Sequence, residues 1–171
     1  MPPTANLTVE ILIAPLRVSL GYAERLAKDI PSDLFAHMPH PKMNHPAFCF
    51  GHLSLYPNQV LRMVGQDDLI VVKHGWDSLF KAGVECVEQD GRYPAKDDIL
   101  AYYFERHHSL LAALADLDEA VLARENPAEG RLKTMFPVLG GALNFYLNNH
   151  HSVHLGQVSA WRRAAGLGAA M

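Results

Sequence analysis

Apolar residues recur at helical spacing in four segments of the chain. In the first, from about Leu7 to Lys28, positions three and four residues apart form one apolar stripe: Leu7, Ile11, Leu12, Leu16, Leu20, Ala23 and Leu26. Such a stripe predicts an amphipathic helix with one face turned to a core. Pro15 falls inside this helix, so we expect either a kink there or a helix that starts later than Leu7.

A second helix is predicted to begin near His45-Pro46, because proline suits a first helical turn and Asn44 or His45 can cap it. It is predicted to end at Gly65, since glycine is common just after a helix. Its inner face carries six residues at helical spacing: Phe48, His52, Leu55, Tyr56, Gln59 and Met63. The sequence therefore predicts one helix that turns His52 toward the core.

Two further helices are predicted, over 96–114 and 137–165. The third has Asp97 and Asp98 in its first turn, where the helix dipole favours negative charge. The fourth follows the i, i+3, i+4, i+7 pattern through ten residues: Leu139, Leu143, Tyr146, Leu147, His150, Val153, His154, Gln157, Val158 and Trp161. Glycines at 166 and 168 are stop signals for this helix.

The connections between these helices are less regular. Leu69-Ile70-Val71-Val72 fits a short strand or a helical turn, and residues 76–87 fit a short helix. A short appended helix is predicted over 117–124 and a turn over 127–133. The segment 66–94 is long, and long loops in compact domains are often functional.

Four amphipathic helices with little strand signal predict an all-α fold, an antiparallel four-helix bundle. The chain has 171 residues, enough for a buried core, so we expect a single domain over residues 1–171. The net charge of −3 offers no basic surface to a nucleic acid. No apolar run reaches the ~18–20 residues that cross a membrane. Without a secretory signal, and with Cys49 and Cys86 forming no disulfide framework, a cytoplasmic location is expected.

Histidine is the one residue type in excess, with ten in the chain. His150 and His154 lie four residues apart on the apolar stripe, and such neighbours project from one face with Cβ atoms about 5–6 Å apart. His52 lies on the apolar stripe of another helix. A buried imidazole without a partner costs about 1–3 kcal/mol per unsatisfied group, and one shared metal ion satisfies all three. The spacing alone leaves open that each makes an ordinary hydrogen bond in the core.

Other candidate residues have simpler interpretations. Gln157 and Tyr56 can reach these histidines, but packing is the simpler role for both. His151 is expected on the flank of the fourth helix or as a donor to a metal ligand. His107 and His108 are expected on the surface.

Two segments resemble the signature segments of the DinB-like (DinB/YfiT) superfamily. They are Phe48-Cys49-Phe50-Gly51-His52-Leu53 and His150-His151-Ser152-Val153-His154-Leu155-Gly156-Gln157, and the ending Trp161-Arg162-Arg163-Ala164-Ala165-Gly166 is similar too. Members of that superfamily are four-helix bundles with a metal-binding histidine triad. The resemblance implies that His52, His150 and His154 hold one divalent ion, zinc or nickel. Phe48 departs from the family pattern, since many relatives have tryptophan there.

The resemblance also implies a metal-dependent enzyme with a small-molecule substrate. Relatives include transferases and isomerases that use low-molecular-weight thiols, and others are described as hydrolases, so the expected function is a thiol-dependent transferase or a hydrolase. Three neutral ligands leave the ion its full charge, so it can lower the pKa of bound water to near ~7 or stabilise a thiolate. The alternative is a non-catalytic bundle that senses or binds a metal or small ligand. A homodimer is expected because such bundles often pair.

Overall fold

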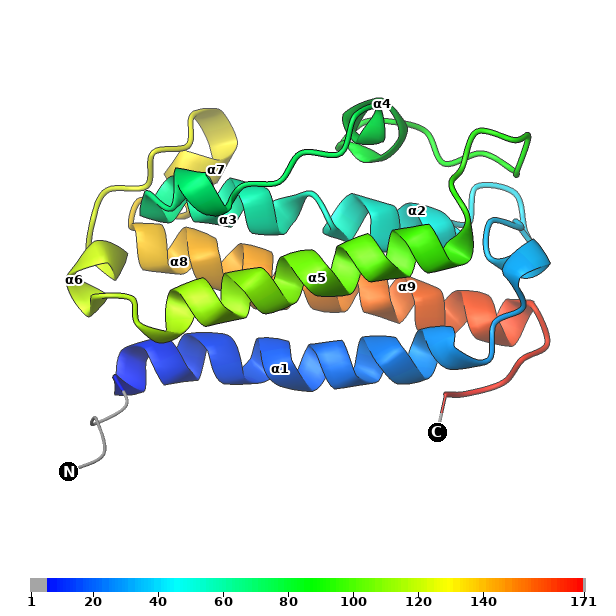
Figure 1. The fold of residues 1–171 in the computed structure, drawn as a ribbon, viewed down its shortest axis with the longest axis horizontal. Coiled ribbons are helices and arrows are strands. Elements are labelled where there is room, and N and C mark those ends of the chain that lie inside the picture. Colours follow the sequence, from blue (N-terminus) through cyan, green and yellow to red (C-terminus); the bar gives the residue numbers. More distant parts are fainter. Residues whose placement is uncertain (1–5, 171) are drawn as a thin grey trace.

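A computed structural model describes residues 6–170 of the chain. Its regular structure is helical, and no strand is present within this range, which confirms the predicted all-α class. The long helices form four rods that lie side by side (Figure 1). The rods are α1 (Leu7–Lys28), α2 (Pro46–Leu53) continued by α3 (Tyr56–Val64), α5 (Lys96–Ala115), and α8 (Leu139–Asn144) continued by η3 (Phe145–His150) and α9 (His151–Ala164). Short helices lie between them: η1 (Ser32–Leu34), η2 (Asp67–Leu69), α4 (Trp76–Phe80), α6 (Glu119–Leu122) and α7 (Gly130–Met135).

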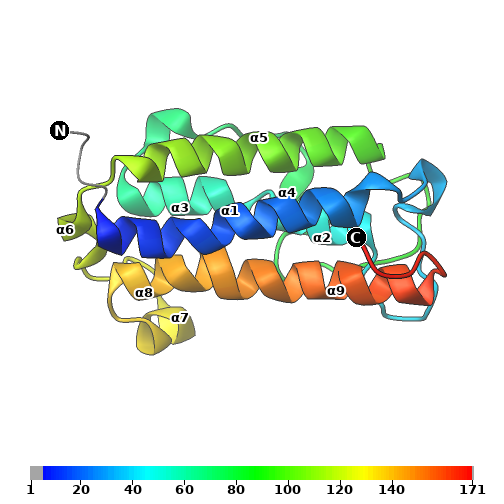
Figure 2. The ribbon, with the colours of Figure 1, turned by 90° about the horizontal axis from the view of Figure 1, so that it is seen from below.

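Each rod packs against two others, which encloses an apolar core. α1 contacts α5 and α9, and α2 contacts the same two helices from the other side. α1 and α9 run in one direction, whereas α2, α3 and α5 run in the other (Figures 1 and 2). The long connection over 65–95 causes this arrangement, because it carries the chain back along the rods before α5 begins.

The first rod begins where the sequence predicts. The Asn6 side chain caps α1 by accepting hydrogen bonds from the backbone N–H groups of Thr8 and Val9, at 3.1 and 3.3 Å. The helix continues through Pro15 without interruption, so the alternative of a start later than Leu7 is wrong. Pro15 lies on the exposed side of the helix, where water can reach the carbonyl group that loses its partner.

The second predicted helix is two helices in the structure, so the prediction of one helix is wrong. Pro57 lies in the first turn of α3. Proline has no N–H group, and inside a helix its ring would clash with the carbonyl group of Leu53, four residues earlier. The chain therefore ends α2 and restarts as α3. Of the two predicted caps, His45 is the one used, since its Nδ1 accepts a hydrogen bond from Phe48 N at 3.1 Å.

The fourth predicted helix is confirmed as a continuous rod, but part of it is not α-helical. Residues 145–150 form the π-helical segment η3. The rod ends as predicted, with Gly166 at a positive φ of 80°. The turn predicted over 127–133 is wrong, because α7 occupies most of that segment. Over 69–72 the chain forms no strand, and within residues 6–170 no helix is long and apolar enough to span a bilayer.

Candidate metal centre

Three histidines from two rods meet at one point in the core. Nε2 of His150 lies 3.2 Å from Nε2 of His52 and 3.2 Å from Nε2 of His154. One ligand atom from each residue lies within 4.8 Å of the other two. Two imidazole nitrogens on a tetrahedral zinc ion, with bonds of about 2.0–2.1 Å, are about 3.3 Å apart. The three side chains are therefore near enough to hold one metal ion.

The hydrogen bonds on the far side of two rings fix which nitrogen faces this point. Nδ1 of His52 lies 2.6 Å from the backbone oxygen of Phe80. Nδ1 of His154 lies 2.9 Å from the side-chain oxygen of Gln157. A carbonyl oxygen only accepts, so both Nδ1 atoms carry the hydrogen and both Nε2 atoms present a lone pair. This is the tautomer that a metal ligand needs.

The surroundings keep the three rings neutral. Burial, followed by the neighbouring His154 and His52 rings, lowers the pKa of His150 to about 3. Burial and the His52 ring lower the pKa of His154 to about 4, although the bond to Gln157 opposes this shift. Burial also lowers the pKa of His52. Three neutral rings whose nitrogens converge, with the lone pairs of His52 and His154 directed inward, fit a cation, which is the group best able to satisfy them together.

A glycine next to His52 in sequence lets the hydrogen-bond acceptor for His52 approach. A Cβ atom built on Gly51 would overlap the ring of Phe80. Because Gly51 has no side chain, α4 can pack closely on α2, and the carbonyl group of Phe80 reaches His52. On the same face of α2, one turn earlier, the Phe48 ring stacks on the His52 ring with centroids 5.9 Å apart. Phenylalanine thus fills a stacking position in this chain.

The π-helical segment η3 contains the first histidine of the pair on this rod, and the second lies one turn later in α9. The segment ends at His150, and α9 begins at His151. A π-helix is wider than an α-helix, is rare, and occurs often at functional sites. The wider turn changes the angular position of His150 relative to the residues before it in α8. Nothing in the apolar pattern of 137–165 predicts this local change.

Gln157 has a larger role than the packing that the sequence predicts. Besides its bond with His154, its side-chain oxygen accepts from Asn44 Nδ2 at 3.1 Å and from Cys49 Sγ at 3.6 Å. Gln157 therefore connects His154 on α9 to α2 and to the loop before α2. The spacing contains a signal for this contact, because position 157 lies three residues after His154 on one helix face.

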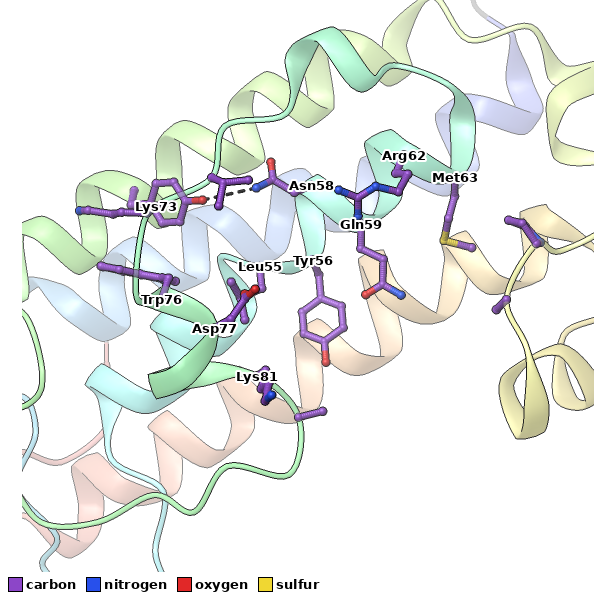
Figure 3. Close-up of a pocket in the computed structure, with 15 residues that line it drawn as sticks. Leu55, Tyr56, Asn58, Gln59, Arg62, Met63, Lys73, Trp76, Asp77 and Lys81 are labelled. Atoms are coloured by element: carbon purple, nitrogen blue, oxygen red, sulfur yellow. Dashed lines mark hydrogen bonds between the residues drawn. The ribbon is translucent and has the colours of Figure 1, made fainter.

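Tyr56 also approaches the histidines more closely than a core aromatic role requires. Its hydroxyl group lies 3.2 Å from Nε2 of His52, and its ring centre lies 4.3 Å from that of His150. Burial raises the pKa of Tyr56 to about 12, so the phenol keeps its hydrogen and can donate it. Tyr56 also lines a cavity between α3 and α4 (Figure 3).

A second group of histidines lies elsewhere in the core and does not join the triad. Tyr103 Oη and His151 Nε2 are 2.6 Å apart, and His107 Nδ1 lies 2.7 Å from the backbone oxygen of Tyr103. The prediction that His107 is a surface residue is wrong, since it is 3% exposed. His151 is buried and points to α5, whereas His108 is exposed as predicted.

The sequence model of the DinB superfamily matches residues 16–158 of the chain. The chain belongs to the DinB superfamily. The matched range includes both DinB-like segments and all three histidines of the cluster, so the family resemblance is confirmed. A comparison with curated proteins finds no match. Membership in the DinB superfamily does not specify a reaction, because the reaction depends on the side chains at the site.

Proposed function

We propose that this DinB superfamily protein is a metal-dependent enzyme in which His52, His150 and His154 hold one divalent ion. The observation that supports it most directly is the pair of 3.2 Å Nε2 separations, with two of the rings fixed by carbonyl acceptors. Zinc and nickel both suit imidazole ligands. When bound, such an ion supplies Lewis-acid chemistry that lowers the pKa of a water or thiol.

The surroundings of the cluster favour a catalytic site over a structural one. Structural zinc sites usually have four protein ligands, whereas catalytic sites keep a position open. Within residues 6–170, the cluster contains three histidines, and no cysteine, aspartate or glutamate joins it. His150 and His154 are half-buried, and Tyr56 places a hydroxyl donor beside them. These features support a thiol-dependent transferase or a hydrolase with a small-molecule substrate, in which Tyr56 donates a hydrogen bond to the reacting group.

Metal analysis tests this proposal. The chain, purified without a histidine tag, should contain about one zinc or nickel ion per molecule by elemental analysis. The His154→Ala variant should lose most of that metal, whereas His40→Ala, which changes an exposed histidine away from the cluster, should retain it. Unchanged metal content in His154→Ala would reject the triad.

A substrate screen then separates the two functional alternatives. The metal-loaded protein is assayed with low-molecular-weight thiols together with electrophilic acceptors, and separately with esters and amides. Turnover that is lost in His154→Ala supports an enzyme. Full metal occupancy without turnover in any assay would support the alternative of a non-catalytic metal-binding bundle.

We also propose that the protein is a cytoplasmic homodimer. The free thiols of Cys49 and Cys86 support a reducing compartment. Three large apolar residues on one face of α1 are exposed, namely Leu7, Ile11 and Val18, at 71%, 66% and 73%. Light scattering after size-exclusion chromatography should give twice the mass of one chain for the unaltered protein. The Ile11→Glu variant should give the mass of one chain. If the unaltered protein has the mass of one chain, the proposed dimer is wrong.

A further inference from the structure

A cavity large enough for a small molecule lies on the outer side of α3. It has a volume of about 670 Å³ and lies between α3, α4 and residues 127–128 (Figure 3). Small-molecule sites in proteins typically measure about 300–1,000 Å³. Its apolar wall is formed mainly by Leu55, Met63, Val72, Trp76, Tyr102 and Pro127. This wall suits a ligand with an apolar or aromatic body.

The charged residues of the cavity are mostly positive, although the chain as a whole carries a net charge of −3. Arg62, Lys73 and Lys81 line it, against the single carboxylate of Asp77. The Lys73 ammonium lies 4.4 Å from the centre of the Trp76 ring. A cavity with more cations than carboxylates attracts an anion.

Two of these cations have no carboxylate partner of their own. Arg62 pairs with Asp67, but at 3.9 Å and with both side chains more than 60% exposed, so water screens that pair. Within residues 6–170, neither Lys73 nor Lys81 forms an ion pair. An incoming carboxylate or phosphate group would therefore displace no strong internal partner.

Tyr56 is shared between this cavity and the histidine cluster. Its ring lines the cavity, while its hydroxyl group lies 3.2 Å from Nε2 of His52. Gln59, another lining residue, donates a hydrogen bond to Tyr146 Oη at 2.8 Å, and the Tyr146 ring contacts that of His150. None of the three histidines lines the cavity itself. A ligand held here would thus touch Tyr56, and through it the candidate metal centre.

We infer that the cavity between α3 and α4 binds a small organic anion, with its apolar body against Trp76 and its carboxylate or phosphate group held by Lys81. This inference rests on the proposed function, because it names a substrate class for the proposed enzyme, bound in a cavity beside the histidine cluster. The binding itself involves no metal ligand. It can therefore be measured on protein treated with a chelator, independently of any turnover.

Fluorescence of Trp76 provides the test. The chain has two tryptophans, so the Trp161→Phe variant leaves Trp76 as the reporter on the cavity wall. The metal-free protein is titrated with benzoate, phenyl phosphate and the neutral analogue benzamide. Benzoate or phenyl phosphate should bind about tenfold more tightly than benzamide, since only the anions meet the cations. The tighter of the two shows which anionic group the cavity prefers.

Charge variants locate the binding. Lys81→Gln should weaken binding of the preferred anion about three- to tenfold and leave benzamide unaffected. Lys28→Gln makes the same charge change at the exposed end of α1, away from the cavity, and should have no effect. If Trp161→Phe fails to fold, calorimetry of the unaltered chain and of the two lysine variants gives the same comparison.

Three results would overturn the inference. The first is equal affinity for benzoate and benzamide, and the second is an equal loss of affinity for the preferred anion in Lys81→Gln and Lys28→Gln. The third is no binding of any probe. None of these results bears on the metal content of His154→Ala. Conversely, a protein without metal could still bind the anion. The failure of this inference and the failure of the proposed function are therefore distinguishable.

Discussion

The side-chain oxygen of Gln157 lies 2.9 Å from Nδ1 of His154, three residues earlier on the same helix. Because this oxygen can only accept, the hydrogen of His154 is held on Nδ1, and Nε2 is left free. The same oxygen accepts from Asn44 and Cys49, which holds it in place. One amide thus sets both the orientation and the tautomer of a candidate ligand.

Replacing Gln157 should weaken metal binding while the fold survives. Gln157→Leu removes the acceptor, so the His154 ring can turn or exchange tautomers, and partners of this kind are typically worth about 10–100-fold in metal affinity. Competition with a coloured chelator measures the change. Gln66→Leu is the matched control, because Gln66 is half-buried in the segment after α3, outside the histidine cluster. Equal affinities in the two variants would show that Gln157 only packs.

The metal-free protein should lose stability as the pH falls from about 6.5 to about 4. Burial lowers the pKa values of His45 and His107 to about 4, from an ordinary value of 6.5. Between these values the unfolded chain binds protons that the folded chain does not, so the free energy of unfolding decreases as the pH falls. Above pH 6.5 both states are neutral at these groups, and they add no pH dependence.

Urea unfolding at several pH values between 4 and 7.5 measures the slope of the free energy of unfolding against pH. His107→Gln should reduce the slope, because the variant no longer has this buried titrating group. His108→Gln changes an exposed neighbour and should leave the slope unchanged. A His107→Gln protein with the full slope would show that His107 does not contribute.

Two glycines should respond in opposite ways to alanine. At Gly51 a methyl group would meet the Phe80 ring, so Gly51→Ala should destabilise the fold by about 1–3 kcal/mol. At Gly156 nothing lies within 4 Å of an added Cβ atom, so Gly156→Ala should stabilise α9 by about 0.5–1 kcal/mol. Urea denaturation compares both variants with the unaltered chain. Similar effects at the two positions would contradict the close packing of α4 on α2.

Arg162, in the ending of α9 that resembles the DinB-like pattern, should stabilise the fold by connecting α9 to the end of α1. The Arg162 side chain is 1% exposed, and it binds the carboxylate of Asp29 and the backbone oxygen of Leu26 at the end of α1. Lysine cannot make this forked contact, so Arg162→Lys should cost about 1.5–3 kcal/mol of unfolding free energy. Arg163→Lys, next in sequence and exposed, should stay within about ±0.5 kcal/mol. Thermal unfolding distinguishes the two variants. An equal loss of stability in both would show that the contact of Arg162 with Asp29 and Leu26 does not stabilise the fold.

Helical periodicity predicts the long rods well because each buries most of one face. Leu7, Ile11 and Val153 belong to the predicted stripes but are exposed, so their placement toward the core is wrong. The predicted helix over 96–114 corresponds to α5 at Lys96–Ala115, and the first helix has the predicted bounds. The break between α2 and α3 was predictable from Pro57, but the apolar stripe through His52 and Met63 continues across it. His107 also had a signal, since it lies on the same stripe as Tyr103, Leu110 and Leu114.

Other features of the candidate site depend on tertiary packing and leave no local trace. The spacing of His150 and His154 points to a shared face, but nothing in the apolar pattern marks the π-helical segment that ends at His150. The acceptor for His52 is a backbone oxygen at Phe80, which lies 28 residues away and could be any residue type. A backbone group carries no signature in the sequence.

The contact between Phe80 and His52 also makes the crossover before α5 part of the core chemistry. The oxygen that orients His52 belongs to α4, a helix of only five residues that packs on α2. Short helices in long connections open more readily than the rods they cover. A rise in temperature, or a molecule that binds beside Trp76, is therefore expected to disturb the acceptor of His52 before it disturbs the rods. The orientation of His52 thus depends on the connection over 65–95 as well as on the rods that carry the three histidines.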